Sequence, residues 1–245
     1  MIPFLAPGAR FPPVERALRR PDGLLAAGGD LSVATLVRAY RQGIFPWFNE
    51  GDPILWWSPN PRMVLRCAEF HVSRTLRRRL NRHDVRVSLD EAFTDVVAAC
   101  AAPRDEEGGT WLVPEMQAAY LAMHAEGLAH SVEVWRGDQL VGGLYGVALG
   151  RMFFGESMVA RETDASKMAM AWLSAQLLDW DMPLVDCQMA TPHLASLGAR
   201  AVPRRQFTAW VTALANQPGP AEWCFDAGLD PVAKLGIAST ELARD

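Results

Sequence analysis

Residues 43–62 read GIFPWFNEGDPILWWSPNPR and hold three of the chain's nine tryptophans. Proline at Pro46, Pro53, Pro59 and Pro61 removes backbone donors and moves each preceding residue out of the α region, so the stretch is not a helix. A stiff, irregular backbone that carries large flat rings suits a wall that stacks on a flat ligand. The run alone leaves a second interpretation open, in which the rings fill a small hydrophobic core.

Length and composition indicate a soluble globular protein. With 245 residues, the chain can bury one large core or hold a small domain and a medium one. Half of the residues are apolar and 21% are charged, and no apolar stretch is long enough to cross a bilayer. The first residues lack a basic segment followed by an apolar one, so no signal peptide is expected. These features favour the cytoplasm.

The cysteines and histidines predict neither a metal site nor a disulfide. Cys67, Cys100, Cys187 and Cys224 are scattered, and the histidines lack metal-binding spacing. We therefore expect buried free thiols, no metal and no cofactor. A nucleophilic serine elbow, a P-loop and a dinucleotide-binding glycine motif are also missing from the sequence. A transfer reaction here would rest on positioning and electrostatics rather than on a covalent intermediate.

A basic stripe follows residue 73 in a chain whose net charge is −4. Such a stripe on an acidic protein attracts a polyanion to one face. A solvated helix face that is paired with carboxylates elsewhere in the fold is the alternative. We favour a face that binds phosphates. The stripe consists of Arg74, Arg77, Arg78, Arg79, Arg82, His83 and Arg86.

The order of the expected elements indicates an α+β fold. Ser32, Ser73 and Asp90 are each expected to cap a helix, and the tail from residue 217 is weakly patterned. Because the proline-rich stretch ends near residue 62, we expect a small N-terminal domain over 1–62 and a larger domain over 63–245. Helices are expected at about 33–42, 92–102, 114–127, 165–180, 192–197 and 204–216, and a further helix is expected to begin at residue 74. Strands are expected at 64–67, 85–89, 131–136, 139–149, 151–159 and 184–189.

Two polar residues on an otherwise apolar strand are candidates for the chemistry. Asp186 and Gln188 lie two positions apart, so their side chains point to the same face of the strand. A buried carboxylate must be paired, hydrogen-bonded or functional, and a structural hydrogen-bond network is the alternative. Glu156 adds a second carboxylate on a neighbouring strand. It could bind a cation, orient an amine or pair with an arginine.

Several long motifs stand along the chain: DGLLAAGGDL (22–31), GIFPWF (43–48), DPILWWSP (52–59), GTW (109–111), GGLYGV (142–147), FGESM (154–158), ASK (165–167), DCQ (186–188), His193, SLGA (196–199) and PRR (203–205). In this order they resemble the leucyl/phenylalanyl-tRNA–protein transferase family over nearly the whole chain. The resemblance implies an aminoacyltransferase that moves leucine, phenylalanine or, less often, methionine from tRNA to proteins that begin with Arg or Lys. The product carries a bacterial degradation signal, following the N-end rule.

The resemblance also implies a fold and a set of site residues. The larger domain should be similar to GNAT acetyltransferases, with a mostly antiparallel sheet flanked by helices. Trp47 and Trp111 would hold the terminal adenosine of the tRNA. Gln188 would orient the incoming α-amine, Asp186 would support it electrostatically and help with its proton, and Glu156 would meet the acceptor's N-terminal Arg or Lys. The aminoacyl pocket matches Leu144, Phe153, Met170, Leu173, Leu177 and Val185, and the acceptor-stem phosphates match Arg74, Arg77, Arg78 and Arg82.

The chain departs from the family pattern where Leu173 and Leu177 replace phenylalanines, so we expect a differently shaped pocket. Three alternatives stay open. An acetyl-CoA-dependent N-acetyltransferase of the GNAT type would need a glycine-bearing pyrophosphate loop, whereas residues 161–166 carry two carboxylates and no glycine. A non-catalytic tRNA-binding protein would need only the aromatic run and the basic stripe. A cell-wall aminoacyltransferase would accept a muropeptide amine.

Overall fold

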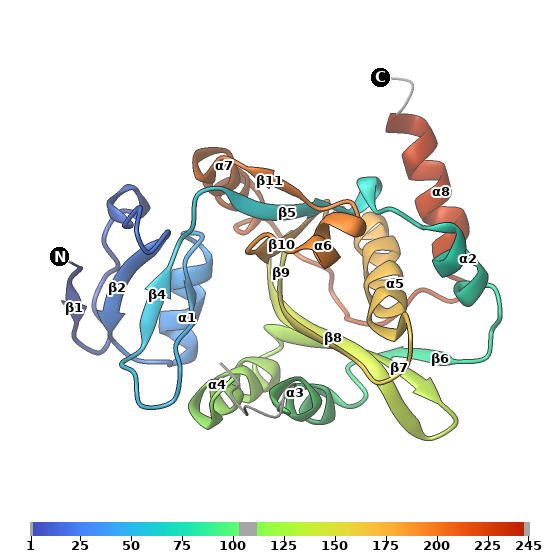
Figure 1. Cartoon of the computed structure of the whole chain (residues 1–245), viewed down its shortest axis with the longest axis horizontal. Helices are drawn as coiled ribbons and strands as arrows, with labels where there is room; N and C mark the ends of the chain where they lie inside the picture. Colours follow the sequence, from blue (N-terminus) through green and yellow to red (C-terminus); the bar gives the residue numbers. More distant parts are fainter. Residues whose placement is uncertain (1, 103–111, 243–245) are drawn as a thin grey trace.

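The computed structural model describes residues 2–102 and 112–242, and the side chains of the last helix as far as residue 236. The described residues form two β-sheets of four and seven strands. The smaller sheet lies at one end of the molecule, and the larger sheet with its helices makes up the rest (Figure 1). The predicted α+β class is therefore confirmed. None of the described helices has the length and apolar character that a membrane span requires.

The N-terminal residues build the smaller sheet around the aromatic and proline-rich run. Trp56 is fully buried and donates its indole N–H to the carbonyl oxygen of Gly28 at 2.8 Å, so core packing is the right interpretation for this ring. Trp47, by contrast, is partly exposed. In the spatial order β1-β2-β4-β3, the strands are β1 (Phe4–Leu5), β2 (Leu24–Gly28), β4 (Leu55–Trp57) and β3 (Phe45–Pro46), with helix α1 (Val33–Tyr40) beside them.

The larger sheet is mostly antiparallel, as the sequence predicts. Among the described strands of this sheet, only β9 and β10 pair in parallel. The larger sheet begins at Arg62, after the small sheet ends at Trp57, while the division into separate domains at residue 62 stays a prediction. In spatial order, the strands are β11 (Arg200–Val202), β5 (Arg62–Arg66), β10 (Leu184–Gln188), β9 (Met152–Ala160), β8 (Gln139–Leu149), β7 (Ala129–Arg136) and β6 (Arg86–Leu89).

Helices cover both faces of the larger sheet (Figure 1). Helices α3 and α4 pack on one face of β7 and β8, and α5 packs on the other, where α2 and α8 lie against it. The central strands are therefore buried from both sides, which explains the nearly continuous apolar run of β8. The helices are α2 (Arg74–Leu80), α3 (Phe93–Ala101), α4 (Pro114–Ala125), α5 (Ala165–Asp179), α6 (Pro192–Ser196), α7 (Arg204–Leu214) and α8 (Pro231–Leu242), with short 3-10 turns η1 (Val14–Arg16) and η2 (Cys67–Glu69).

Two of the three expected helix caps are confirmed. The hydroxyls of Ser32 and Ser73 each accept a hydrogen bond from the backbone N–H three residues further on. The expectation for Asp90 is wrong, because helix α3 starts after Ala92 without a side-chain cap. Asp90 instead accepts the backbone N–H of Ser131 at 2.7 Å and contacts the His130 ring at 2.6 Å.

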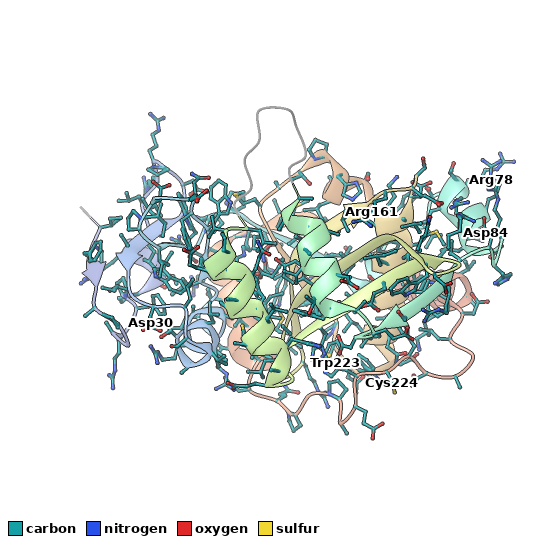
Figure 2. The ribbon with its side chains drawn as sticks, turned by 90° about the horizontal axis from the view of Figure 1, so that it is seen from below. Asp30, Arg78, Asp84, Arg161, Trp223 and Cys224 are labelled. Carbon is teal, nitrogen blue, oxygen red and sulfur yellow. The ribbon has the colours of Figure 1, made fainter. Side chains whose placement is uncertain are left out.

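The tail holds more structure than its weak pattern predicts. Helix α8 forms at its end, and Leu235 is buried in the hydrophobic cluster that α8 shares with α2 and α5. Trp223 stacks on His130 of β7 with ring centroids 3.7 Å apart, and Figure 2 shows it beside Cys224 near the lower edge of that view. Cys224 is exposed nearby, contrary to the expected burial of every thiol.

Two glycines of β8 let neighbouring backbone and helix approach closely. A Cβ on Gly146 would lie 2.3 Å from the carbonyl oxygen of Phe154, and a Cβ on Gly142 would lie 2.5 Å from the Cβ of Ala165. Glycine inside a strand often marks a place where another group comes close, and here the approaching groups belong to β9 and α5. The contacts set β9 tightly against β8 beside the site described next.

Candidate functional site

Strands β9 and β10 open into a fork. They pair in parallel at Met152–Phe154 and Leu184–Asp186, after which β9 continues along β8 while β10 stays with β5. The fork contains a cavity of about 390 Å³, within the usual range for small-ligand sites. We call it the fork cavity. Its walls come from β8, β9, β10, α5 and α6.

A β-bulge on each arm of the fork turns the candidate side chains toward the cavity. On β9, Glu156 is the extra residue between two successive pairs with β8. On β10, Cys187 is the extra residue between the pairs made by Asp186 and Gln188. Gln188 has a φ of +53°, in the left-handed region that few non-glycine residues occupy. Bulges that re-aim side chains are common beside active sites.

The fork cavity has an apolar wall that only partly matches the predicted aminoacyl pocket. Leu144, Met170 and Val185 line the cavity. The other three predicted residues do not line it. Phe153, Leu173 and Leu177 are buried in the hydrophobic cluster that also contains Leu144, Met170 and Val185.

Trp47 reaches the same site from the smaller sheet. It lines a second cavity of about 170 Å³ together with Glu156 and Gln188. This Trp47 cavity adjoins the fork cavity, because both are lined by Glu156, Gln188 and Leu194. The Trp47 ring rests edge-on against Trp57, whose indole N–H donates to the Trp47 carbonyl oxygen at 2.6 Å. Trp111, the second predicted aromatic residue, lies outside the described residues.

Asp186 forms a buried ion pair with Arg62. The Nε and Nη2 atoms of Arg62 donate to the two carboxylate oxygens of Asp186 at 2.8 and 2.6 Å, and both side chains are 0% exposed. Asp186 also lies in the wall of the fork cavity. Asp186 therefore takes part in a structural network, the alternative that the sequence left open, because its charge is paired with Arg62. Asp186 can act on the cavity as a fixed negative charge.

Glu156 is held by neutral donors. The hydroxyls of Tyr40 and Tyr120 donate to its two oxygens at 2.8 and 2.5 Å, and the side-chain amide of Gln188 donates at 3.2 Å. Burial, with the nearby Asp186 charge, raises the pKa of Glu156 from 4.5 to about 7, although the two tyrosine hydrogen bonds and Arg62 oppose the shift. Burial and the nearby Glu156 charge raise the pKa of both phenols well above 10, so both remain donors.

Gln188 joins the two carboxylates. Its backbone N–H donates to Asp186 Oδ1 at 3.0 Å, and its side-chain amide reaches Glu156. At the cavity rim, burial and then Lys167 lower the pKa of His193, which favours a neutral ring at neutral pH. The site thus combines an apolar floor, a fixed carboxylate, a titratable carboxyl and one amide. No group of three metal-binding side chains occurs in the described ranges.

The predicted phosphate-binding arginines lie away from this site. Helix α2 packs against α5, and Arg78 lies at the opposite end of the molecule from Asp30, which follows β2 of the small sheet (Figure 2). Arg79 and Arg86 pair with carboxylates, as the solvated-face interpretation expects. The four predicted residues are exposed, and they are Arg74, Arg77, Arg78 and Arg82. None of the four belongs to an ion pair found within residues 2–102 and 112–236.

Three residues that complete the site are missing from the sequence-based predictions. Arg62 stands at the predicted domain boundary, Tyr40 on the inner face of a helix, and Tyr120 in an ordinary helical stretch. A buried tyrosine needs a hydrogen-bond partner for its hydroxyl, but the sequence does not show which residue that partner is. Arg62 and Asp186 are 124 residues apart, so no local pattern connects them.

Comparison with known proteins gives consistent matches along the chain. The family model for leucyl/phenylalanyl-tRNA protein transferase matches residues 64–212, and the model for its N-terminal domain matches residues 29–60. The leucyl/phenylalanyl-tRNA–protein transferase of Nitrosomonas europaea is 56% identical over 227 residues, which are 92% of this chain and 96% of that protein. The enzyme of the same name from Aromatoleum aromaticum is 57% identical over 224 residues, 91% of this chain and 94% of that protein.

Solved structures resemble the chain more distantly. A GCN5-related N-acetyltransferase from Kribbella flavida gives a TM-score of 0.38 at 11% identity, over 69% of this chain and 60% of that one. L-PGS from Bacillus licheniformis gives a TM-score of 0.38 at 10% identity, over 90% and 73%. TM-scores this low establish no relationship. The family models and the relatives in sequence do establish one, and they show that the chain belongs to the leucyl/phenylalanyl-tRNA–protein transferase family.

Proposed function

We propose that this chain transfers leucine or phenylalanine from aminoacyl-tRNA to the α-amine of cytoplasmic proteins that begin with arginine or lysine, marking them for degradation. Family membership gives the enzyme class, the tRNA donor and the protein acceptor. The preference for Arg or Lys and the location are our proposals. One observation carries the reaction site: Trp47, Glu156 and Gln188 line one cavity, which adjoins the apolar fork cavity.

The donor end of the tRNA would occupy both cavities. Trp47 is placed to stack on the terminal adenosine, and base stacking of this kind contributes about 1–3 kcal/mol without reading sequence. The leucine or phenylalanine side chain would enter the fork cavity against Leu144, Met170 and Val185. Such an apolar pocket rejects charged side chains strongly and separates similar apolar ones by only about 1–3 kcal/mol per methylene. The buried residues Phe153, Leu173 and Leu177 would shape the pocket from behind, and Trp111 would add a second ring.

The transfer needs no covalent enzyme intermediate. The acceptor nitrogen bonds to the carbonyl carbon of the aminoacyl ester, the bond from that carbon to the tRNA oxygen breaks, the amine loses a proton and the tRNA oxygen gains one. Gln188 would orient the amine through its side-chain amide. Asp186 would supply a fixed negative charge beside the developing positive charge on the nitrogen. Its two oxygens are held by Arg62, which favours this electrostatic role.

Glu156 would select acceptors that begin with a cation. In the free chain its pKa is raised to about 7 because burial penalises the charged form. An acceptor whose first side chain is arginine or lysine brings the missing positive charge, lowers that pKa and gains an ion pair. An acceptor that begins with alanine brings no such charge. The arginines of α2 would hold acceptor-stem phosphates, giving binding that weakens with salt and reads little sequence.

The test is a transfer assay with two peptides, one beginning with Arg and one with Ala, in the presence of leucyl-tRNA. We expect mass spectrometry to find a leucine increment on the Arg peptide only. An increment on neither peptide contradicts the proposed function, and an increment on both contradicts the acceptor preference. Gln188→Asn tests whether the side-chain amide of residue 188 orients the amine. Asparagine tolerates the positive φ at this position, but its amide is shorter in reach by one methylene. Gln217→Asn, in the exposed tail, is its matched control.

The same assay separates the alternatives. A non-catalytic tRNA-binding protein would bind leucyl-tRNA without modifying either peptide. An acetyl-CoA-dependent enzyme would add an acetyl mass, although Glu162 and Asp164 occupy the segment where a pyrophosphate would have to lie. A cell-wall aminoacyltransferase would modify a muropeptide amine and leave the Arg peptide unchanged.

A further inference from the structure

Arg62 is a fully buried charged residue that holds Asp186, and the reaction described above gives it no part of its own. Among the ion pairs of residues 2–102 and 112–236, only Arg62 and Asp186 have both side chains 0% exposed. Burying two charges is costly, and such a pair is often no more stabilising than apolar residues of the same size. Stability alone therefore does not account for this arginine.

Besides Asp186, two segments of the chain, residues 43–45 and helix α7, contact the guanidinium of Arg62. Its Nη1 donates to the carbonyl oxygen of Gly43 at 3.3 Å, in the turn that follows α1. Its central carbon lies 4.7 Å from the ring centroid of Phe45 on β3 and 4.6 Å from that of Phe207 on α7. A planar fork between two rings suits arginine, because a lysine ammonium neither stacks in this way nor donates two parallel hydrogen bonds.

The contacts of Arg62 continue to the residue that is proposed to orient the amine. Arg62 holds both oxygens of Asp186, and Asp186 Oδ1 also accepts the backbone N–H of Gln188. That bond supports Gln188 in its left-handed conformation, from which the side-chain amide reaches Glu156. A shift of Asp186 would thus move the backbone and the amide of Gln188.

We infer that Arg62 is a positioning residue for aminoacyl transfer: it fixes the Asp186 carboxylate and, through it, the conformation of Gln188 at the fork. This inference rests on the proposed function. Arg62 does not touch the reacting atoms, and it acts only through Asp186. Its removal should therefore lower the rate of the transfer step and leave the affinity for tRNA nearly unchanged.

The test is a double-mutant cycle with Arg62→Met, Asp186→Asn and the double variant, plus Arg62→Lys. We expect transfer at saturating peptide to fall at least about tenfold in each variant, because small misplacements of orienting groups have effects of that size. Binding of uncharged tRNA should stay within about threefold of the wild type, and the double variant should lose no more rate than the worse single variant. Arg66→Met, on the same strand but half exposed, is the control and should keep the wild-type rate.

The double variant separates positioning from support of the fold. It contains no lone buried charge, so it should melt near the wild-type temperature while transfer stays low. A stable double variant that regains the wild-type rate overturns the inference, and so does an unimpaired Arg62→Lys. A double variant that does not fold also contradicts it, because the pair would then be a requirement of the fold. If the wild-type chain transfers no leucine at all, the proposed function fails instead.

Discussion

The charge of Glu156 should make the folded chain less stable as pH rises, and Glu156→Gln isolates that effect. Burial next to Tyr40 and Tyr120 raises the pKa of Glu156 from 4.5 to about 7. Because the folded pKa lies above the unfolded one, the neutral carboxyl contributes stability that is complete below pH 4.5 and is lost as pH rises through about 7. A shift of this size corresponds to about 3 kcal/mol, and screening of the partly exposed side chain reduces the expected effect to about 2 kcal/mol.

The measurement is urea unfolding of the wild type and of Glu156→Gln, followed by tryptophan fluorescence. Near about pH 5 the two free energies of unfolding should be similar, and near about pH 8 the variant should be more stable by about 2 kcal/mol. Glu50→Gln removes a carboxylate from an exposed turn and serves as the control for a general charge effect. A difference between wild type and Glu156→Gln that is the same at both pH values would refute the reasoning.

Three further changes test other parts of the structure. Trp47→Ala should weaken binding of leucyl-tRNA by about 1–3 kcal/mol in filter binding while Trp47→Phe keeps most of the affinity, and equal losses would argue against stacking. Gly146→Ala should lower the free energy of unfolding by about 1–3 kcal/mol, because its Cβ would lie 2.3 Å from a β9 carbonyl oxygen, and an unchanged melting temperature would contradict the tight β8–β9 contact. Replacing Arg77 and Arg78 by glutamine should reduce the slope of log affinity for tRNA against log salt by about 2, and an unchanged slope would remove α2 from the tRNA-binding surface.

Much of the local structure could be predicted because its causes lie within a few residues. The hydroxyls of Ser32 and Ser73 bond to backbone groups three positions away, so their helices begin where the sequence indicates. The prolines of residues 43–62 exclude a helix through their own ring geometry. The cap predicted at Asp90 is wrong for the opposite reason. Asp90 stands where a helix cap is expected, yet its carboxylate contacts the His130 ring and accepts the backbone N–H of Ser131, about 40 residues further along the chain.

In the candidate site, too, some residues could be predicted from the sequence and others could not. The motifs point to Asp186, Gln188 and Glu156 as polar side chains on apolar strands, because a buried polar group stands out against its neighbours. Their partners do not stand out. Arg62 meets Asp186 across 124 residues, and Tyr40 meets Glu156 across 116. These contacts exist only once β9 and β10 diverge, and a bulge on each strand then turns the side chains toward a common cavity. Hydrogen bonds within one turn or strand are encoded by neighbours, whereas the charge state and orientation of each carboxyl depend on which distant groups the fold brings within 3 Å of it.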